Sequence, residues 1–560
     1  MSTLSLQEDQ KKGATIETTE TVSCSISTTS IDPNEPDKGL KRTLKSRHLT
    51  MISIGGVVGQ GKTDVEKSRS SVDLNRLLDT GLFLSSGANL AKAGPAGLLV
   101  AYFIIGYIVF WIAVELGEMA AYIPISGSFT VYCRRFVDKS FGTVIGYNYW
   151  ACWSIIVAVE LTAIPLVMRF WTDRVPDWAW SGIFLVVMFA MNLYGARGWG
   201  EAEYWFSLVK IICVVVFVIV GCLTSGGVIG GTVYGFKYWK DPGAFSNGVL
   251  GVINALVLAA LSMTGTDIVG VSAGESANPR KAIPQAVKNV FFRIIFIYIL
   301  SVFVMGMLIP WNDPHNLSLS GRDTTVSPFT LVFQKAGLNG ADSVVNAVIL
   351  ITFISCGNSG MYVTTRTLCA LANEGIAHRK LAAYVNKRGV PIYSLICTSA
   401  VSLVCFLTSW IPGAALFLVL SSLAGIAGLI TWFGIALSHY RFRKAMIVQG
   451  KDLNQLPYIA PGHPYMNLLS MAACIVIILI SGWSYFVPAD AIGLVGSYGG
   501  ALIALGGYLA LKFWTKSKLV PLDQIDLDTG VRYFTLEELA AEKDQDKQLT
   551  IWQKIKSAII

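Results

Sequence analysis

Twelve long apolar segments lie between residues 49 and 514. A helix needs about 20 apolar residues to cross the hydrocarbon layer of a membrane. Only 14% of the residues are charged, whereas soluble proteins carry about 25%, and the mean hydropathy is +0.55. The sequence therefore predicts an all-α polytopic membrane protein and excludes a soluble enzyme, a disordered scaffold and a secreted disulfide-rich domain. The expected spans are 49–91 (interrupted), 98–121, 143–171, 179–195, 204–225, 248–274, 289–310, 342–372, 391–410, 413–438, 466–487 and 492–514.

Two polar tails, residues 1–48 and 515–560, flank this twelve-helix domain of residues 49–514. The chain start, MSTLSLQEDQKK, lacks the apolar stretch of a signal peptide, so we expect the first tail to stay in the cytoplasm. An even number of spans places both tails on one side of the membrane. The loops on that side would hold fifteen Lys and Arg residues and the opposite loops six. The positive-inside rule therefore predicts that both termini are cytoplasmic.

Other classes of protein leave signals that this sequence lacks. Its ten cysteines show no C-x-x-C pair and no metal-ligand spacing with histidine, so we interpret them as small apolar residues within helices. The sequence contains no Walker loop, dinucleotide fingerprint or catalytic triad. The five histidines, at positions 48, 315, 378, 439 and 463, are expected in loops or at the ends of spans. We expect no enzyme activity, metal, cofactor or nucleic-acid partner, despite the net charge of +8.

Glycines interrupt the first and sixth spans, which lie five helices apart. The first carries Gly55, Gly56 and Gly59, and the sixth carries Gly265 within SMTGTDIVGVSAGE. Paired interruptions point to the central site of a transporter, because irregular backbone at membrane depth survives only where it lines a cavity or binds a ligand. A half-helix N-terminus suits a carboxylate, and exposed carbonyls suit an ammonium. The two breaks would thus hold an amino acid; alternatively, the glycines only allow close helix packing.

Several segments resemble the fungal amino acid permeases of the amino acid-polyamine-organocation superfamily. The matches are IGGVVG, TGLFLSSGANLAKAGPAGLL, ELGEMAAYIPISGSFTVYCRRFVDKSFG, GTDIVGVSAGESANPRKAIPQAVKNVFFRI, NSGMYVTTRTLCALANEG and GIAGLITWFGIALSHYRFRKAM. They cover about residues 40–518 in family order. The resemblance implies a LeuT-like core of five plus five helices related by inversion, with helices one and six broken and two helices added. It also implies import of amino acids by proton symport at the plasma membrane.

One segment departs from the family pattern. In the family, the first-helix motif runs from GxxG directly into TGLF, but here residues 60–79 separate Gly59 from Thr80. This segment holds eight charged residues, which are costly within a membrane span. Our hypothesis is that residues 60–79 are a translated intron, because their removal restores GGVVGTGLF without a frame shift. The alternatives are a genuine regulatory insertion and a non-functional isoform.

Residues close to the two interruptions, with two residues of later spans, are the candidates for substrate binding. They are Gly55, Gly56, Gly59, Thr80, Gly81, Ser262, Thr264, Gly265, Thr266, Asn358 and Ser422.

Three ionisable residues within the spans are candidates for proton coupling, since such groups are costly to bury. Glu160 lies midway along the third span, where the resemblance places an acidic residue of the pathway; a packing role is the alternative. Lys210 is the only charge within 204–225, and related transporters place a lysine there where sodium-coupled relatives hold their ion; snorkelling is the alternative. Asp267 stands where the family usually has Glu, which weakens any inference about specificity.

The leading prediction is a secondary active transporter that works by alternating access and favours basic or broad-range amino acids. Glu160 and Asp267 would suit a cationic substrate. The alternative is a transporter-like amino acid sensor. Expected partners are the amino acid, protons, the lipid bilayer, and ubiquitin-ligase adaptors that act on tail lysines such as Lys11 and Lys12. We assign Glu115 and Glu118, near one end of the second span, to gating or structure.

Overall fold

The computed structural model describes residues 81–125, 128–265, 287, 290–313, 327–338, 340–453, 456–486 and 489–531. Within these ranges the regular structure is helical, apart from one isolated bridge between Val385 and Pro391. The prediction of an all-α polytopic membrane protein is confirmed, since nine of the described helical segments are long and apolar enough to cross a membrane. Two shorter apolar helices, Asp177–Leu193 and Gly248–Met263, accompany them. Residues 1–48 and the unusual segment 60–79 lie outside the described residues.

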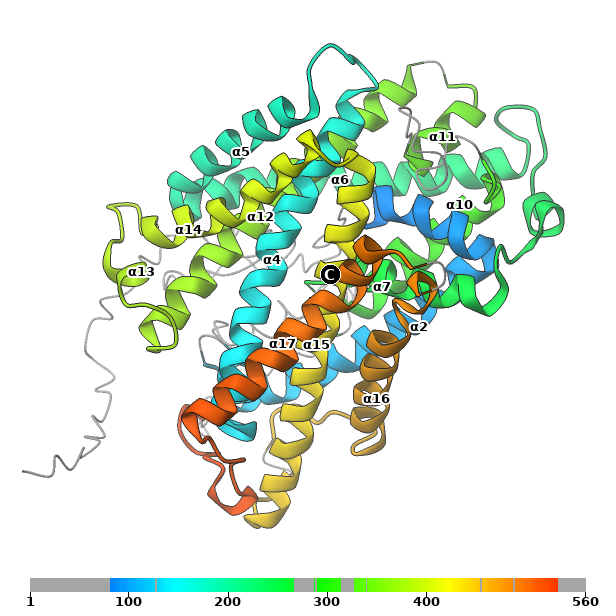
Figure 1. Cartoon of the computed structure of the whole chain (residues 1–560). Helices are drawn as coiled ribbons and strands as arrows, with labels where there is room; N and C mark the ends of the chain where they lie inside the picture. The colour runs from blue at the N-terminus through cyan, green and yellow to red at the C-terminus, as the bar shows by residue number, and fades with distance from the viewer. Residues whose placement is uncertain are drawn as a thin grey trace, which may run out of the picture. The chain divides into compact units, whose positions relative to one another are not determined.

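The long helices follow the predicted spans from the second span onward (Figure 1). Their bounds are α2 Ser86–Tyr122, α4 Lys139–Met168, α5 Asp177–Leu193, α6 Gly195–Ser225, α7 Gly248–Met263, α10 Leu300–Leu308, α12 Ala341–Asn373, α14 Ile392–Ser402, α15 Gly413–Val448, α16 Tyr465–Ile480 and α17 Ala491–Thr515. The short helices are α3 Ser128–Tyr132, α11 Pro328–Lys335 and α13 Lys380–Ala383. Single π-helical or 3₁₀ turns are η1 Gly81–Ser85, η2 Cys133–Val137, η3 Trp239–Gly243, η4 Ile294–Ile299, η5 Leu403–Ser409, η7 Trp483–Tyr485 and η8 Leu522–Gln524.

A sharp turn at Gly94 divides α2 into the end of the first span and the whole of the second. Gly94 has a φ of 76°, which is accessible to glycine at little cost, and Pro95 then starts the new helix. A side chain at Gly94 would lie 2.7 Å from the carbonyl oxygen of Ala244, so the position also requires glycine for space. The hydrogen bonds Ala96 N–Ala244 O (2.9 Å) and Ser246 N–Ala93 O (3.1 Å) close the turn.

The centre of the described helices is formed by α4, α12 and α15, with α7 packed between α2 and α15. Glycines allow the closest approach of α7 to α15. A Cβ atom at Gly425 would lie 2.5 Å from the carbonyl oxygen of Val257, and one at Gly428 would lie 2.9 Å from the Thr264 hydroxyl. The backbones therefore meet at a distance that no larger residue permits, which brings the end of α7 into the interior.

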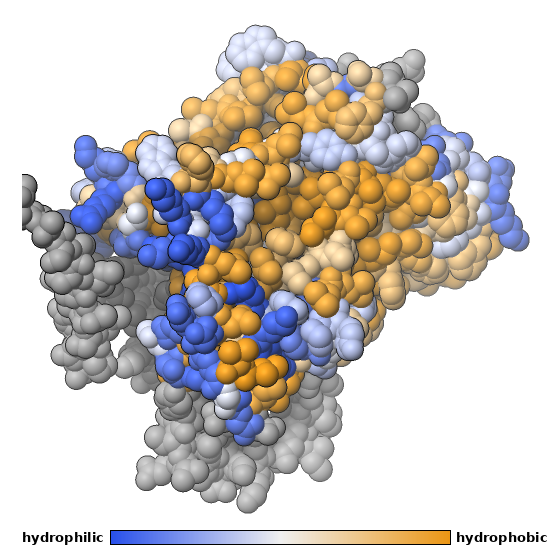
Figure 2. Space-filling model, turned by 60° about the horizontal axis from the view of Figure 1, so that its bottom comes forward, coloured by the Kyte–Doolittle hydropathy of each residue, from blue (hydrophilic) through white to orange (hydrophobic). Residues whose placement is uncertain are grey.

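Other helix surfaces are apolar and exposed, as expected for contact with lipid. On α17, which runs beside α15 (Figure 1), Ile503 is 77% exposed and Phe513 is 88% exposed. Figure 2 shows broad apolar areas on the visible face of the molecule, next to polar patches. In water such an area would be a liability for aggregation. A surrounding bilayer removes that cost, in agreement with the predicted membrane location.

The chain after α17 does not leave the helices at once. Residues 517–531, which we call the C-terminal strap, run back over the ends of α15 and η2. The strap bonds to them through its backbone, with Val520 N donating to Val137 O (2.9 Å) and Gln449 Nε2 donating to Ile525 O (2.7 Å). Ile525 and Leu527 are buried, at 2% and 0% exposed. The predicted tail boundary at 514 thus matches the end of α17, and the tail's first part is packed.

Candidate functional site

Helix α7 stops in the interior, at the place where the sequence predicts an interrupted span. Its last residue is Met263; Thr264 follows with extended backbone (ψ 148°), and Gly265 has a φ of +92°. A positive φ of this size is readily accessible only to glycine, so Gly265 permits the chain to leave the helical path. Helix α7 thus ends at the position where the sequence predicts the interruption, and the chain after Gly265 lies outside the described residues.

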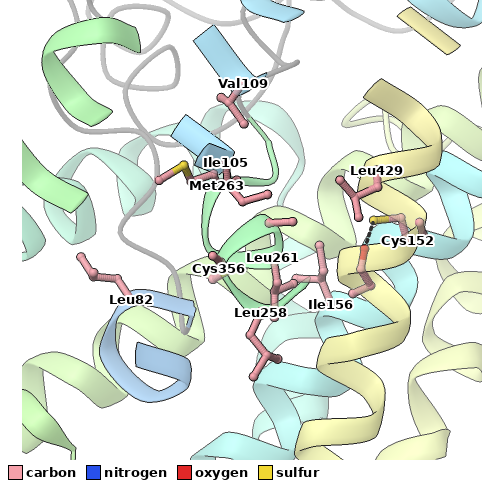
Figure 3. Packing of buried hydrophobic residues seen from close by; sticks show 14 of the residues in the cluster. Leu82, Ile105, Val109, Cys152, Ile156, Leu258, Leu261, Met263, Cys356 and Leu429 are labelled. Carbon is pink, nitrogen blue, oxygen red and sulfur yellow. Dashed lines mark hydrogen bonds between the residues drawn. The ribbon is translucent and has the colours of Figure 1, made fainter. Parts of the chain in front are cut away.

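The first described turn of the chain lies against the end of α7. This turn, η1, contacts α7 and continues directly into the first part of α2. Ser327, at the start of α11, donates a hydrogen bond to the Phe83 carbonyl (2.7 Å), which occupies one acceptor of the irregular turn. Figure 3 shows Leu82 of η1 and Met263 of α7 in one group of buried apolar side chains with Ile105 of α2. The turn η1 and the end of α7 therefore share one buried apolar region.

Hydroxyl groups cluster around this region. Ser262 Oγ lies 2.9 Å from the Tyr102 hydroxyl, and Thr264 Oγ1 donates to the Ala260 carbonyl (3.0 Å). The hydroxyls of Ser85 and Ser421 are buried and have no hydrogen-bond partner within the described ranges. A buried polar group without a partner is costly unless a ligand or water supplies one. These groups are suited to bind a polar ligand at the breaks.

Glu160 lies in the middle of α4 and is only 1% exposed. Its side chain approaches α12 at Gly357, where an added Cβ would lie 3.4 Å from the Cβ of Glu160. The neighbouring Asn358 accepts a hydrogen bond from Asn192 of α5 (Oδ1 to Nδ2, 2.9 Å). Glu160 is thus a buried acid at the contact between α4 and α12, as the sequence placed it.

Lys210 belongs to a buried ion pair within α6. Its ammonium lies 3.4 Å from Oε1 of Glu203 and donates to Ser355 Oγ of α12 at 2.6 Å. Glu203 is 0% exposed and Lys210 is 3% exposed. Because both charges are removed from solvent, the side chain of Lys210 does not extend to a membrane surface, and the snorkelling alternative is wrong.

A second buried network joins α2, α15 and the segment before α16. Glu118 forms an ion pair with Arg443 (Oε1 to Nε, 2.5 Å) and accepts a hydrogen bond from the Ala460 backbone N–H (2.6 Å to Oε2), and His439 Nε2 lies 3.2 Å from Oε2. Asn467 Nδ2 lies 2.7 Å from His439 Nδ1. His439 is 0% exposed within α15, so its expected place at a span end is wrong. The network gives Glu118 a structural role.

His463 adjoins this network just before α16. Its Nδ1 lies 2.9 Å from the Asn467 side-chain oxygen. Burial, which is the largest influence, and the nearby His439 and Arg443 lower the pKa of His463, while Asn467 and Glu118 act in the opposite direction. The imidazole is therefore neutral around pH 7. Within the described ranges, no group of three or more His, Cys, Asp or Glu residues is arranged to hold a metal ion.

Comparison with known proteins identifies the class of molecule to which this geometry belongs. The family model for amino acid permeases matches residues 48–523. The chain belongs to the amino acid permease family. Two lysine-specific permeases named LysP are similar: that of Escherichia coli is 42% identical over 86% of this chain and 94% of its own length, and that of Lactococcus lactis is 41% identical over 87% and 93%. The lysine-specific permease of Saccharomyces cerevisiae is 36% identical over 93% of this chain and 83% of its own length.

The family match confirms the resemblance to fungal amino acid permeases and makes this protein a multi-pass membrane transporter of amino acids rather than an enzyme. The permease brings some of its sequence-predicted site residues together. Gly81, Ser262, Thr264 and Gly265 lie at or beside the two breaks. Gly55, Gly56, Gly59, Thr80, Thr266 and Asp267 lie outside the described residues.

Two further candidates for substrate binding, Asn358 and Ser422, form hydrogen bonds with other residues of the protein. Asn358 bonds to Asn192 of α5, and the Ser422 hydroxyl donates to the Leu418 carbonyl of its own helix (2.9 Å). Their roles in substrate binding stay predictions, and the buried Nδ2 of Asn358 has no hydrogen-bond partner within the described ranges.

Sequence reasoning missed Glu203 as a charged neighbour of Lys210. We expected the fifth span to begin at 204 and Lys210 to be its only charge, but α6 begins at Gly195 and includes Glu203. The error arose because the polar sequence GARGWGEAE lowers the local hydropathy. The spacing of seven residues, two helical turns, was the available signal, since it places Glu203 and Lys210 on one helix face.

Proposed function

We propose that this permease imports basic amino acids, lysine above all, across the plasma membrane by proton symport with alternating access. The observation that carries the proposal is the buried break after Met263, where Thr264 and Gly265 leave the helical path beside η1. The exposed N–H and carbonyl groups of interrupted helices suit the carboxylate and ammonium that every amino acid shares. The similarity to three lysine-specific permeases supports a cationic substrate side chain.

Glu160 is the described residue best suited to receive that cationic side chain or a coupling proton. It is a buried acid on α4, and ionisable groups within membrane spans are rare and commonly belong to proton or substrate pathways. Asp267 would have the same capacity beside the α7 break. Lys210, in its ion pair with Glu203, is the third group that exchange of a proton would affect. In this proposal the termini face the cytoplasm.

Uptake in a yeast strain that lacks its own lysine transporters tests the proposal. Radiolabelled lysine should accumulate faster at pH 5 than at pH 7.5, arginine should compete and leucine should not, and a protonophore should abolish accumulation. Glu160→Gln should reduce uptake strongly, whereas Glu374→Gln, which removes an acid at the end of α12, should not. Uptake that is insensitive to pH and to the protonophore would contradict symport. Binding of lysine without any uptake would indicate the sensor.

A further inference from the structure

The carboxylate of Glu203 accepts more hydrogen bonds than a residue that only joins two helices would need. Ser355 Oγ lies 2.8 Å from both of its oxygens, Ser359 Oγ donates to Oε2 at 3.1 Å, and Ser207 Oγ lies 3.4 Å from Oε1. Two of these serines belong to α12 and one to α6. Three hydroxyl groups and the Lys210 ammonium thus converge on the Glu203 carboxylate.

Ser355 also connects the carboxylate to Lys210. A hydroxyl has one proton to donate and can accept from another donor. Lys210 has only donors, so its ammonium donates to Ser355 Oγ (2.6 Å), and Ser355 in turn donates to Glu203. The ammonium therefore has two anchors, the direct contact with Oε1 at 3.4 Å and the path through Ser355. Both anchors depend on the Glu203 carboxylate.

The buried network has no net charge only when it contains both the Glu203 carboxylate and the Lys210 ammonium. A single ion in the interior is costly, and removing one partner from a buried pair leaves the other uncompensated. With Glu203 ionised and Lys210 protonated, the network is neutral overall. If Lys210 released its proton while Glu203 stayed ionised, a buried negative charge would remain.

Within the described ranges, Glu203 is the acid that pairs with the Lys210 ammonium. The guanidinium of Arg366 on α12 lies 4.3 Å from the Tyr362 ring, which itself stacks on Trp199 at 3.9 Å. The charged residue of α5, Asp177, bonds to Arg169, and that of α11, Lys335, bonds to the Leu308 carbonyl. Helix α10 carries no charged residue. Glu160 approaches α12 from α4, at Gly357.

We infer that Glu203 is the positioning residue for Lys210: directly and through Ser355 it holds the ammonium at the contact of α6 with α12. The inference rests on the proposed function, in which Lys210 takes part in coupling to protons. Glu203 itself need not touch the substrate. Its loss should therefore damage coupling to the pH gradient far more than it damages the movement of substrate through the protein.

The test uses the purified full chain in proteoliposomes, with two assays of labelled lysine. One measures accumulation driven by an imposed pH gradient, and the other measures exchange of internal for external lysine without a gradient. The variants are Glu203→Gln, Lys210→Met and the double variant. Glu201→Gln is the matched control, since it removes an acid two residues away on the same helix.

Glu203→Gln should lower accumulation by about tenfold while exchange changes by less than about threefold, and the double variant should be no worse than Lys210→Met alone. The pH profile of accumulation should also change, because the residue that holds the Lys210 ammonium in place is lost. Glu203→Asp should partly restore both values, which a misfolded variant would not allow.

Equal loss of accumulation and exchange, with an unchanged pH profile, would show that Glu203 only joins α6 to α12 and would overturn the inference. The unaltered protein separates this failure from failure of the proposed function. If it exchanges lysine but cannot accumulate it under a pH gradient, symport itself is wrong and the inference falls with it. If it accumulates lysine and Glu203→Gln does so equally well, the inference alone is wrong.

Discussion

Arg443 of α15 and Glu118 of α2 form a buried ion pair in which Nε lies 2.5 Å from Oε1. The guanidinium also donates to the Ala460 carbonyl (3.1 Å), while the Ala460 N–H donates to Glu118. Both members of the ion pair are thus hydrogen-bonded to the backbone of the same residue, Ala460. The arrangement joins the ends of α2 and α15 to the segment that enters α16.

Glu118→Gln should therefore destabilise the permease severely, because it leaves Arg443 as an uncompensated buried charge. We expect a loss of about 3–5 kcal/mol, measured as a lower midpoint of thermal unfolding in detergent. Arg134→Gln is the control, since it removes a partly exposed pair in which Arg134 and Glu374 are 3.8 Å apart. Such pairs contribute at most about 1 kcal/mol. Similar losses for the two variants would contradict the structural role of Glu118.

The positions of the helices were largely predictable from sequence, because apolar runs of span length and glycine at a break are local signals. Gly265 is an example, since its positive φ follows from the residue type. Glu203 and His439 were not predictable in the same way. Both are polar residues in helices that continue beyond the apolar run, and both are buried only because α12 or α2 supplies their partners. Contacts between segments that are distant in sequence cannot be predicted from the local hydropathy of either segment.

The C-terminal strap illustrates the same limit. Its sequence carries three aspartates and belongs to a locally acidic segment, so the prediction was a polar tail. Within it, Ile525 and Leu527 alternate with Asp526 and Asp528. In an extended chain this alternation places the two apolar side chains on one face, and that face is buried. The signal was present but short enough to be missed.

Leu527→Ala should destabilise the strap and with it the end of the helices that it covers. Leu527 is 0% exposed, and truncation of a fully buried leucine costs about 2–5 kcal/mol. Leu519→Ala in the same segment should have little effect, because Leu519 is 52% exposed. Limited proteolysis of the folded permease would report the difference as faster cleavage after residue 516. Equal cleavage of both variants would show that the strap does not depend on Leu527.

Acid should weaken the strap through Asp526. Burial by itself would raise the pKa of Asp526, but hydrogen bonds from the Thr529 backbone and from Arg135 outweigh it and lower that pKa. A carboxyl with a lowered pKa in the folded state stabilises the fold above its unfolded pKa of about 3.9, and this contribution is lost as the pH falls through the folded value. Lys451, paired with Asp528, adds a second contact of the same kind.

Asp526→Asn should accordingly reduce the stability of the strap at pH 7 and make it less dependent on pH below about 4. Proteolysis of the strap by an acid-active protease, followed across this pH range, measures the effect. Asp523→Asn is the matched control, because Asp523 is exposed and lies three residues away. If both variants respond to acid as the unaltered chain does, the bonds of Asp526 do not stabilise the strap.

Gly425→Ala should disrupt the close approach of α15 to α7. The new methyl group would lie 2.5 Å from a backbone oxygen, that of Val257, which cannot move without shifting α7. Overpacking of this kind costs about 1–3 kcal/mol. In α17, Gly506→Ala meets no atom within 4 Å, so it should be neutral or stabilising by up to about 1 kcal/mol through its better helix propensity. Thermal unfolding in detergent compares the two, and a neutral Gly425→Ala would contradict the packing described.

Removal of residues 60–79 should create or greatly improve lysine uptake. The segment brings eight charged residues into the first span, directly before the described turn η1 that packs against the α7 break. Charges at membrane depth are costly and are tolerated only where they have partners or water, so the full-length chain should insert or fold poorly. Surface labelling and radiolabelled lysine uptake at pH 5 would show the difference between the two chains.

Replacing residues 60–79 by a neutral Gly/Ser segment of equal length separates the effect of charge from the effect of length. If the charges alone are harmful, this variant should reach the cell surface; if the interruption itself displaces η1 from α7, the variant should reach the surface and still fail to take up lysine. Restored uptake only on complete removal would therefore support the translated-intron hypothesis. Uptake by the full-length chain equal to that of the shortened chain would refute it, because the first span would then form its half of the site with the insertion in place.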